Sequence, residues 1–122
     1  MIEHTFQLPR PNGEMEIFVV RPARGGAWPA VILYMDMWGF RATLLDIARG
    51  VAAAGYYCVL PDLYYRRGKV RYAARDIPGL KLSFADLEPE RQTALRAAMD
   101  GLSNAMVIED TAALLDALSR DA

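Results

Sequence analysis

A strand–helix–strand pattern within about thirty residues is the feature that most limits how this chain can fold. The uninterrupted apolar run from Ala30 to Met35 is typical of a β-strand covered on both faces. Apolar residues then recur at helical spacing over residues 41–54, and Gly55 ends the predicted helix. A second apolar run covers residues 56–60 and ends at Pro61. This order predicts a right-handed βαβ unit with two parallel strands.

The segment before this unit predicts a β-hairpin. Apolar and polar residues alternate over residues 2–8, which indicates a half-buried strand. Asn12 and Gly13 can take the positive φ angles of a tight turn, and residues 15–21 would form the second strand.

The segment after the unit begins with a long irregular stretch over residues 62–84. Loops of this length inside a compact domain are usually functional or mobile. Two helices are predicted beyond it: one over residues 88–99, and one capped by Ser103 that ends near Arg120. The predicted fold class is therefore α/β, with an antiparallel hairpin followed by a parallel βαβ unit and flanking helices.

Composition limits the classes of function. The 122 residues allow one domain at most, and 53% hydrophobic with 24% charged residues is typical of a globular protein. The net charge of -1 gives no reason to expect nucleic acid or an anionic membrane as a partner. A single cysteine excludes an internal disulfide and a cysteine-based metal site. With no visible secretory signal and no long apolar run, we expect a cytoplasmic protein without metal or cofactor.

Two segments resemble the dienelactone hydrolase family. They read Pro-Ala-Val-Ile-Leu-Tyr-Met-Asp-Met-Trp-Gly-Phe-Arg at 29–41 and Ala-Gly-Tyr-Tyr-Cys-Val-Leu-Pro-Asp-Leu-Tyr at 54–64. In order and separation they resemble the third strand, first helix and fourth strand of that family. The resemblance implies that residues 1–122 are a single partial domain, the N-terminal half of an α/β-hydrolase sheet.

The resemblance also implies what this half lacks. An α/β-hydrolase carries its nucleophile on a G-x-S-x-G elbow or the cysteine version, followed along the chain by an acid and a histidine. The elbow strand would follow the helix that ends near Arg120, so we expect the chain to be truncated before it and inactive alone. The intact enzyme would hydrolyse a small-molecule carboxylic ester or lactone through a covalent acyl-enzyme, with Cys or Ser as nucleophile.

By the same resemblance, the loop after the third strand contributes to the active site. The backbone N–H of Met37 would be one oxyanion donor, and Asp36 would be the acidic neighbour of the nucleophile. The family more often has Glu at that position, and a turn-forming Asp is the alternative. Trp38 and Phe40 would line the substrate pocket.

An arginine for a substrate carboxylate is also implied, in the least similar part of the chain. The candidates are Arg66, Arg67, Arg71, Arg91 and Arg96. We take Arg66 and Arg67 as the predicted substrate-binding residues. A solvated loop face is the alternative for the basic run that also includes Lys69 and Arg75, whereas nucleic-acid binding disagrees with the acidic remainder of the chain.

Other residues that could carry chemistry favour structural interpretations. His4 is the only histidine and comes too early in the chain for the hydrolase order. Cys58 lies within an apolar strand and is expected to be a small buried hydrophobe. Ser103 follows helical sequence and is predicted to be a helix cap. The turn at 36–41 has one glycine and a tryptophan, which excludes the phosphate cradle of a Rossmann site.

A non-catalytic α/β module that associates with a partner chain is the alternative function. In the family's strand order the third strand neighbours the fifth, which would lie beyond Ala122. The segment from Ala30 to Met35 would then be an open apolar edge. We expect a second copy, the missing C-terminal half or a rearranged segment to occupy it.

Overall fold

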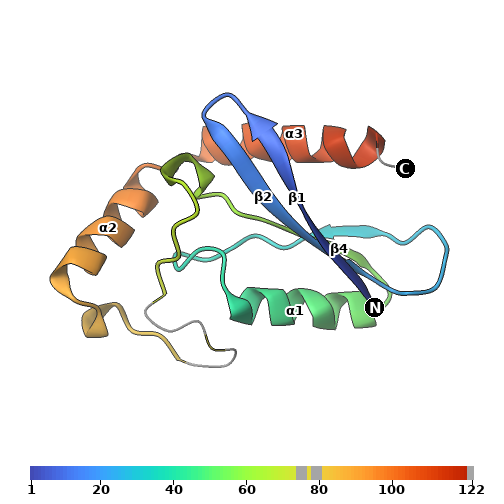
Figure 1. The fold of residues 1–122 in the computed structure, drawn as a ribbon, viewed down its shortest axis with the longest axis horizontal. Helices are drawn as coiled ribbons and strands as arrows, with labels where there is room; N and C mark the ends of the chain where they lie inside the picture. The colour runs from blue at the N-terminus through green and yellow to red at the C-terminus, as the bar shows by residue number, and fades with distance from the viewer. Residues whose placement is uncertain (74–76, 78–80, 121–122) are drawn as a thin grey trace.

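The computed structural model describes residues 1–73, 77 and 81–120, and its centre is a four-stranded mixed sheet in the order β1-β2-β4-β3 (Figure 1). The elements in chain order are β1 (Ile2–Arg10), β2 (Gly13–Arg21), β3 (Ala30–Ile32), α1 (Ala42–Ala53), β4 (Tyr57–Pro61), the 3-10 helices η1 (Tyr65–Arg67) and η2 (Phe84–Asp86), α2 (Pro89–Asp100) and α3 (Asn104–Arg120). The predicted α/β class, hairpin and βαβ unit are confirmed.

The hairpin supplies one of the two central strands of the sheet. β1 and β2 pair antiparallel from Ile2 with Arg21 to Arg10 with Gly13, which leaves a two-residue turn. Gly13 has a φ of 144°, a conformation that side chains rarely adopt. β2 also pairs with β4, so its side chains are buried on both faces of the sheet.

β3 and β4 are parallel and are connected by α1, as predicted. β3 is shorter than the expected strand from Ala30 to Met35, because it ends at Ile32. The expectation that it is covered on both faces is also wrong, since its side chains are exposed or half-buried. The physical reason is its place at the end of the sheet: among the described residues it pairs with β4 alone.

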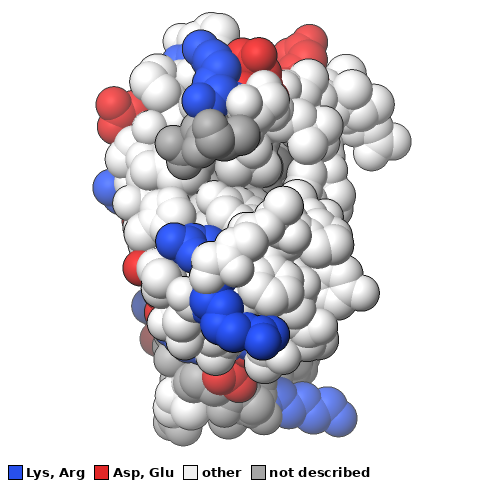
Figure 2. Space-filling model, turned by 90° about the vertical axis from the view of Figure 1, so that its right-hand side faces the viewer, with Lys and Arg blue, Asp and Glu red and all other residues white. Residues whose placement is uncertain are grey.

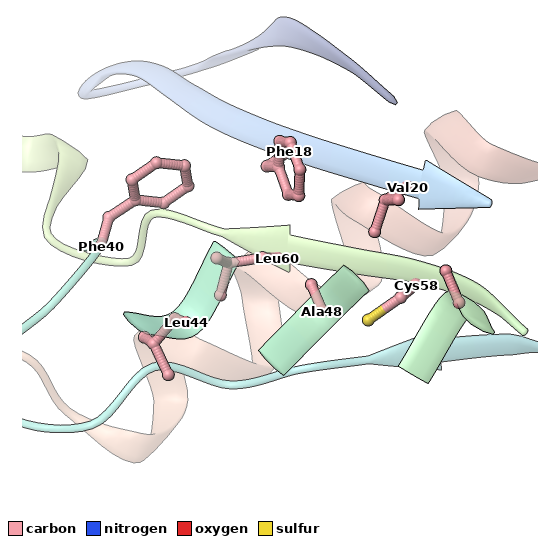
Figure 3. Packing of buried hydrophobic residues seen from close by; sticks show 8 residues of the cluster. Phe18, Val20, Phe40, Leu44, Ala48, Cys58 and Leu60 are labelled. Carbon is pink, nitrogen blue, oxygen red and sulfur yellow. The ribbon is translucent and has the colours of Figure 1, made fainter. Parts of the chain in front are cut away.

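Helices cover both faces of the sheet, with α1 on one face and α3 on the other (Figure 1). Helical spacing places Leu44, Ala48 and Ala52 on the buried face of α1. They pack against Phe18 and Val20 of β2 and against residues of β4 (Figure 3). The opposite face of β2 packs on α3, where Leu114 is fully buried.

α2 lies beside the loops that follow β3 and β4. Its Leu95 and Ala98 are buried with Trp38 and Tyr64 in a third cluster. The predicted cap of α3 is confirmed, because Ser103 Oγ accepts the N–H of Met106 at 3.2 Å. Within the described parts of the chain, no helix is long and apolar enough to cross a membrane.

Candidate active site

The segment after β3 folds into a tight turn built by Asp36. Its carboxylate accepts the backbone N–H of Trp38 at 3.0 Å and pairs with Arg41 at 2.8 Å. Its carbonyl accepts the N–H of Gly39 at 3.0 Å, which closes a four-residue β-turn with Met37 at the second position. The turn-forming interpretation of Asp36 is therefore confirmed, and its role beside a nucleophile stays a prediction.

Met37 is held in this turn with its own N–H free. Within the described residues, no acceptor forms a hydrogen bond with that N–H. The carbonyl of Asp36 belongs to the same planar peptide, so its bond to Gly39 also fixes the direction of the Met37 N–H. The donor is thus oriented before any ligand arrives, which an oxyanion site requires.

Tyr64 connects this turn to the loop after β4. Its hydroxyl donates to the carbonyl of Met37 at 2.9 Å, across 27 positions of sequence. Its backbone N–H donates to Asp62 Oδ1 at 3.1 Å. Burial raises the pKa of the Tyr64 phenol to about 12, so the hydroxyl remains a proton donor at neutral pH.

Asp62 is the centre of a buried ion-pair cluster. It is 1% exposed, and its Oδ2 pairs with Arg71 at 3.0 Å. Arg71 also pairs with Glu16 of β2 at 2.7 Å and lies over the Phe40 ring at 4.7 Å. Burial raises the pKa of the Asp62 carboxyl, and the charge of Arg71 opposes that change. The cluster ties the loop after β4 to the sheet.

The two arginines predicted to bind substrate contact protein groups. Arg66 pairs with the fully buried Asp110 of α3 through both of its terminal nitrogens, at 2.9 and 3.1 Å. Arg67 donates to the carbonyl of Ala97 at 2.9 Å, near the end of α2. Their role in binding a substrate carboxylate stays a prediction, and Arg75 of the basic run lies outside the described residues.

A hollow of about 380 Å³ lies at the carboxyl end of β3, beside the turn. It is lined by Tyr34, Met35, Asp36, Met37, Leu63, Tyr64, Met99, Leu102 and Val107. Trp38 and Phe40 are not among its lining residues: Trp38 packs with Tyr64 and α2, and Phe40 packs against α1. Their predicted place in the substrate pocket stays untested.

The structural interpretations of the other reactive residues agree with the structure. Cys58 is fully buried, and that burial raises the pKa of its thiol, the opposite of what a nucleophile needs. His4 is exposed on β1 and stacks on Phe6. No group of three or more His, Cys, Asp or Glu that could hold a metal ion occurs in the described parts of the chain.

Charged side chains are dispersed on the face of the molecule that Figure 2 shows. Figure 2 shows basic and acidic groups scattered over a largely uncharged surface on that side.

Sequence reasoning missed the roles of Asp62, Tyr64 and Asp110. The signal for Asp62 was present, because a carboxylate directly after a buried strand is costly unless paired. The bond from Tyr64 to Met37 had no local signal, since it joins two loops that meet only in the folded sheet.

Comparison with known proteins gives the class to which this fold and turn belong. The sequence model of the dienelactone hydrolase family matches residues 15–122, and the chain belongs to that family. A putative carboxymethylenebutenolidase of Salmonella typhi is 34% identical over 86 residues, which are 70% of this chain and 32% of the relative. A putative hydrolase fragment, YghX, of Escherichia coli K12 is 37% identical over 59 residues, which are 48% of this chain and 50% of the relative.

A solved structure supports the same fold. The crystal structure of a putative dienelactone hydrolase from Klebsiella pneumoniae superposes with a TM-score of 0.71 at 22% identity. The match covers 98% of this chain and 44% of the relative. The chain therefore has the α/β-hydrolase fold of that relative and spans less than half of its length.

Proposed function

We propose that this chain supplies the oxyanion-binding part of an enzyme that hydrolyses small-molecule carboxylic esters or lactones. The observation that carries the proposal is the oriented N–H of Met37, which has no acceptor among the described residues and lies beside a hollow at the carboxyl end of β3. A Cys or Ser from elsewhere in the enzyme would attack the carbonyl carbon, and the N–H would stabilise the resulting oxyanion. The alcohol would leave, and water would release the acid from the acyl-enzyme.

The nucleophile, its acid and its histidine lie outside residues 1–122 in this proposal. Ser103 caps a helix, Cys58 is fully buried, and His4 is exposed and stacks on Phe6. Residues 1–122 alone are accordingly inactive, and activity requires the part of the family fold that the relatives have beyond their matched segments.

The test uses a joined protein, in which residues 1–122 replace the structurally matched part of the Klebsiella relative. Met37→Pro removes the proposed donor, and proline is well accommodated at the second position of a β-turn. We expect kcat for p-nitrophenyl acetate to fall about 100-fold or more, as for loss of one oxyanion donor. The control Met37→Leu keeps the N–H and should retain kcat within about threefold. Equal kcat for the two variants would contradict the proposal.

A second candidate is a non-catalytic α/β module that binds a partner chain through the open edge of β3. The observation that favours it is an apolar surface next to that edge. Tyr34, Ile108 and Leu115 are 45%, 68% and 51% exposed and line one hollow between the end of β3 and α3. An active joined protein favours the enzyme, and a folded but inactive one that still binds a partner favours the module.

A further inference from the structure

The hydroxyl of Tyr64 binds the peptide group between Met37 and Trp38, directly after the proposed oxyanion donor. It donates to the carbonyl of Met37 at 2.9 Å, while the carbonyl of Asp36 is held by Gly39 at 3.0 Å. The peptides before and after Met37 therefore each have one fixed carbonyl. Because a peptide is planar, these two bonds together restrict both backbone dihedrals of Met37.

Tyr64 can act in this way because it is itself buried and held by several contacts. Its side chain is 5% exposed and makes an edge contact with Tyr72 at 5.1 Å between ring centroids. Its N–H is bonded to Asp62, which Arg71 ties to β2 through Glu16. The position of the hydroxyl is thus fixed relative to the sheet through buried and partly buried contacts.

The turn is also shaped around the Tyr64 ring. Gly39 has a φ of 82°, and a Cβ there would lie 2.9 Å from Cδ2 of Tyr64. Turn and ring are therefore in contact on two sides, through the hydroxyl at Met37 and through the ring at Gly39.

We infer that Tyr64 is a positioning residue of the oxyanion site: its hydroxyl holds the Met37 carbonyl so that the Met37 N–H keeps one direction. This rests on the proposed function for its catalytic consequence only. An oxyanion donor is effective because it needs no reorganisation during the reaction, so a loosened Met37 stabilises the transition state less.

Tyr64→Phe removes the bond and keeps the ring, and Tyr72→Phe is the matched control. Tyr72 is a buried residue whose ring contacts Tyr64, and its hydroxyl makes no hydrogen bond within the described residues.

The first measurement needs no activity and uses the 122-residue chain. Met37-Trp38 is the only Met-Trp pair in the sequence. Labelling methionine carbonyl carbons with ¹³C and tryptophan nitrogens with ¹⁵N therefore gives a single HNCO peak from this peptide. We expect Tyr64→Phe to move the ¹³C shift upfield through loss of the hydrogen bond, and Tyr72→Phe to leave it nearly unchanged. Equal shifts in the two variants would overturn the inference.

The second measurement is kinetic and uses the joined protein. Tyr64→Phe should lower kcat about three- to tenfold, the range for loss of one neutral hydrogen bond, with KM within twofold. Tyr72→Phe should change neither constant. If Met37→Pro lowers kcat and Tyr64→Phe does not, the positioning role fails and the proposed function stands. If Met37→Pro has no effect on kcat while the HNCO peak moves, the proposed function fails and the structural part of the inference stands.

Discussion

Gly39 is the residue at which the turn after β3 depends most directly on the absence of a side chain. Its φ of 82° disfavours any other residue, and an added Cβ would meet the Tyr64 ring at 2.9 Å. We expect Gly39→Ala to lower the free energy of unfolding by about 1–3 kcal/mol, measured by urea denaturation.

Gly50 provides the matched control for that substitution. It lies inside α1, and an added Cβ there has no atom within 4 Å. Gly50→Ala should raise the free energy of unfolding by about 0.5–1 kcal/mol, because alanine restricts the unfolded chain and favours a helix. Similar effects of the two substitutions would show that the contact with Tyr64 does not constrain the turn.

At the residue scale, the sequence was sufficient for residues whose role is local. Asp36 follows a strand and bonds to groups two to five positions away, so the turn it forms could be predicted. Tyr64 donates a hydrogen bond to Met37 across 27 positions of sequence, and Arg66 donates one to Asp110 across 44 positions. Such contacts depend on how segments distant in the sequence meet in the folded protein. The local pattern of apolar and polar residues does not specify this.

Among the elements, α3 is linked to β1 and η1 by one buried carboxylate, in addition to its apolar packing on β2. Asp110 is fully buried and accepts hydrogen bonds from Tyr65 at 2.8 Å and from Arg66, with Arg10 of β1 at 3.3 Å. Asp110→Ala would leave two guanidinium groups without their acceptor. We expect a loss of about 3 kcal/mol in the free energy of unfolding, measured by urea denaturation.

The control for Asp110 is on the same helix. Asp116 pairs with Arg120 at 2.6 Å, but both side chains are more than half exposed. Asp116→Ala should change the free energy of unfolding by less than about 0.5 kcal/mol. If Asp110→Ala lowered the free energy of unfolding by as little as Asp116→Ala, the buried cluster would contribute little to holding α3 on the sheet.

Most elements could be predicted because their patterns are periodic, and the exceptions have identifiable causes. α1 keeps its buried face at helical spacing, and the hairpin keeps its register through a two-residue turn. β3 was predicted too long, because its apolar run alone could not show that the strand pairs on one edge. Asp110 shares a helix face with Val107 and Leu114, a signal that it would be buried.

For the whole molecule, we predict association, because β3 pairs on one side only among the described residues and an apolar surface lies beside it. We expect the 122-residue chain to show a concentration-dependent mass in sedimentation equilibrium, because an unpaired strand and exposed apolar side chains favour it. Ile108→Lys combined with Leu115→Lys should shift the distribution toward monomer. Ile47→Lys, at a residue of α1 that is 46% exposed on the other side of the sheet, is the control. A chain that is monomeric at all concentrations would contradict this prediction.

The central claim is that residues 1–122 hold an oxyanion donor of a dienelactone-hydrolase-family enzyme and not its nucleophile. The most direct measurement is hydrolysis of p-nitrophenyl acetate by the purified chain alone and by the joined protein. We expect the chain alone to hydrolyse p-nitrophenyl acetate at the background rate, and the joined protein to show catalytic turnover. Turnover by the chain alone that is lost in Cys58→Ala, Ser103→Ala or His4→Ala would contradict it.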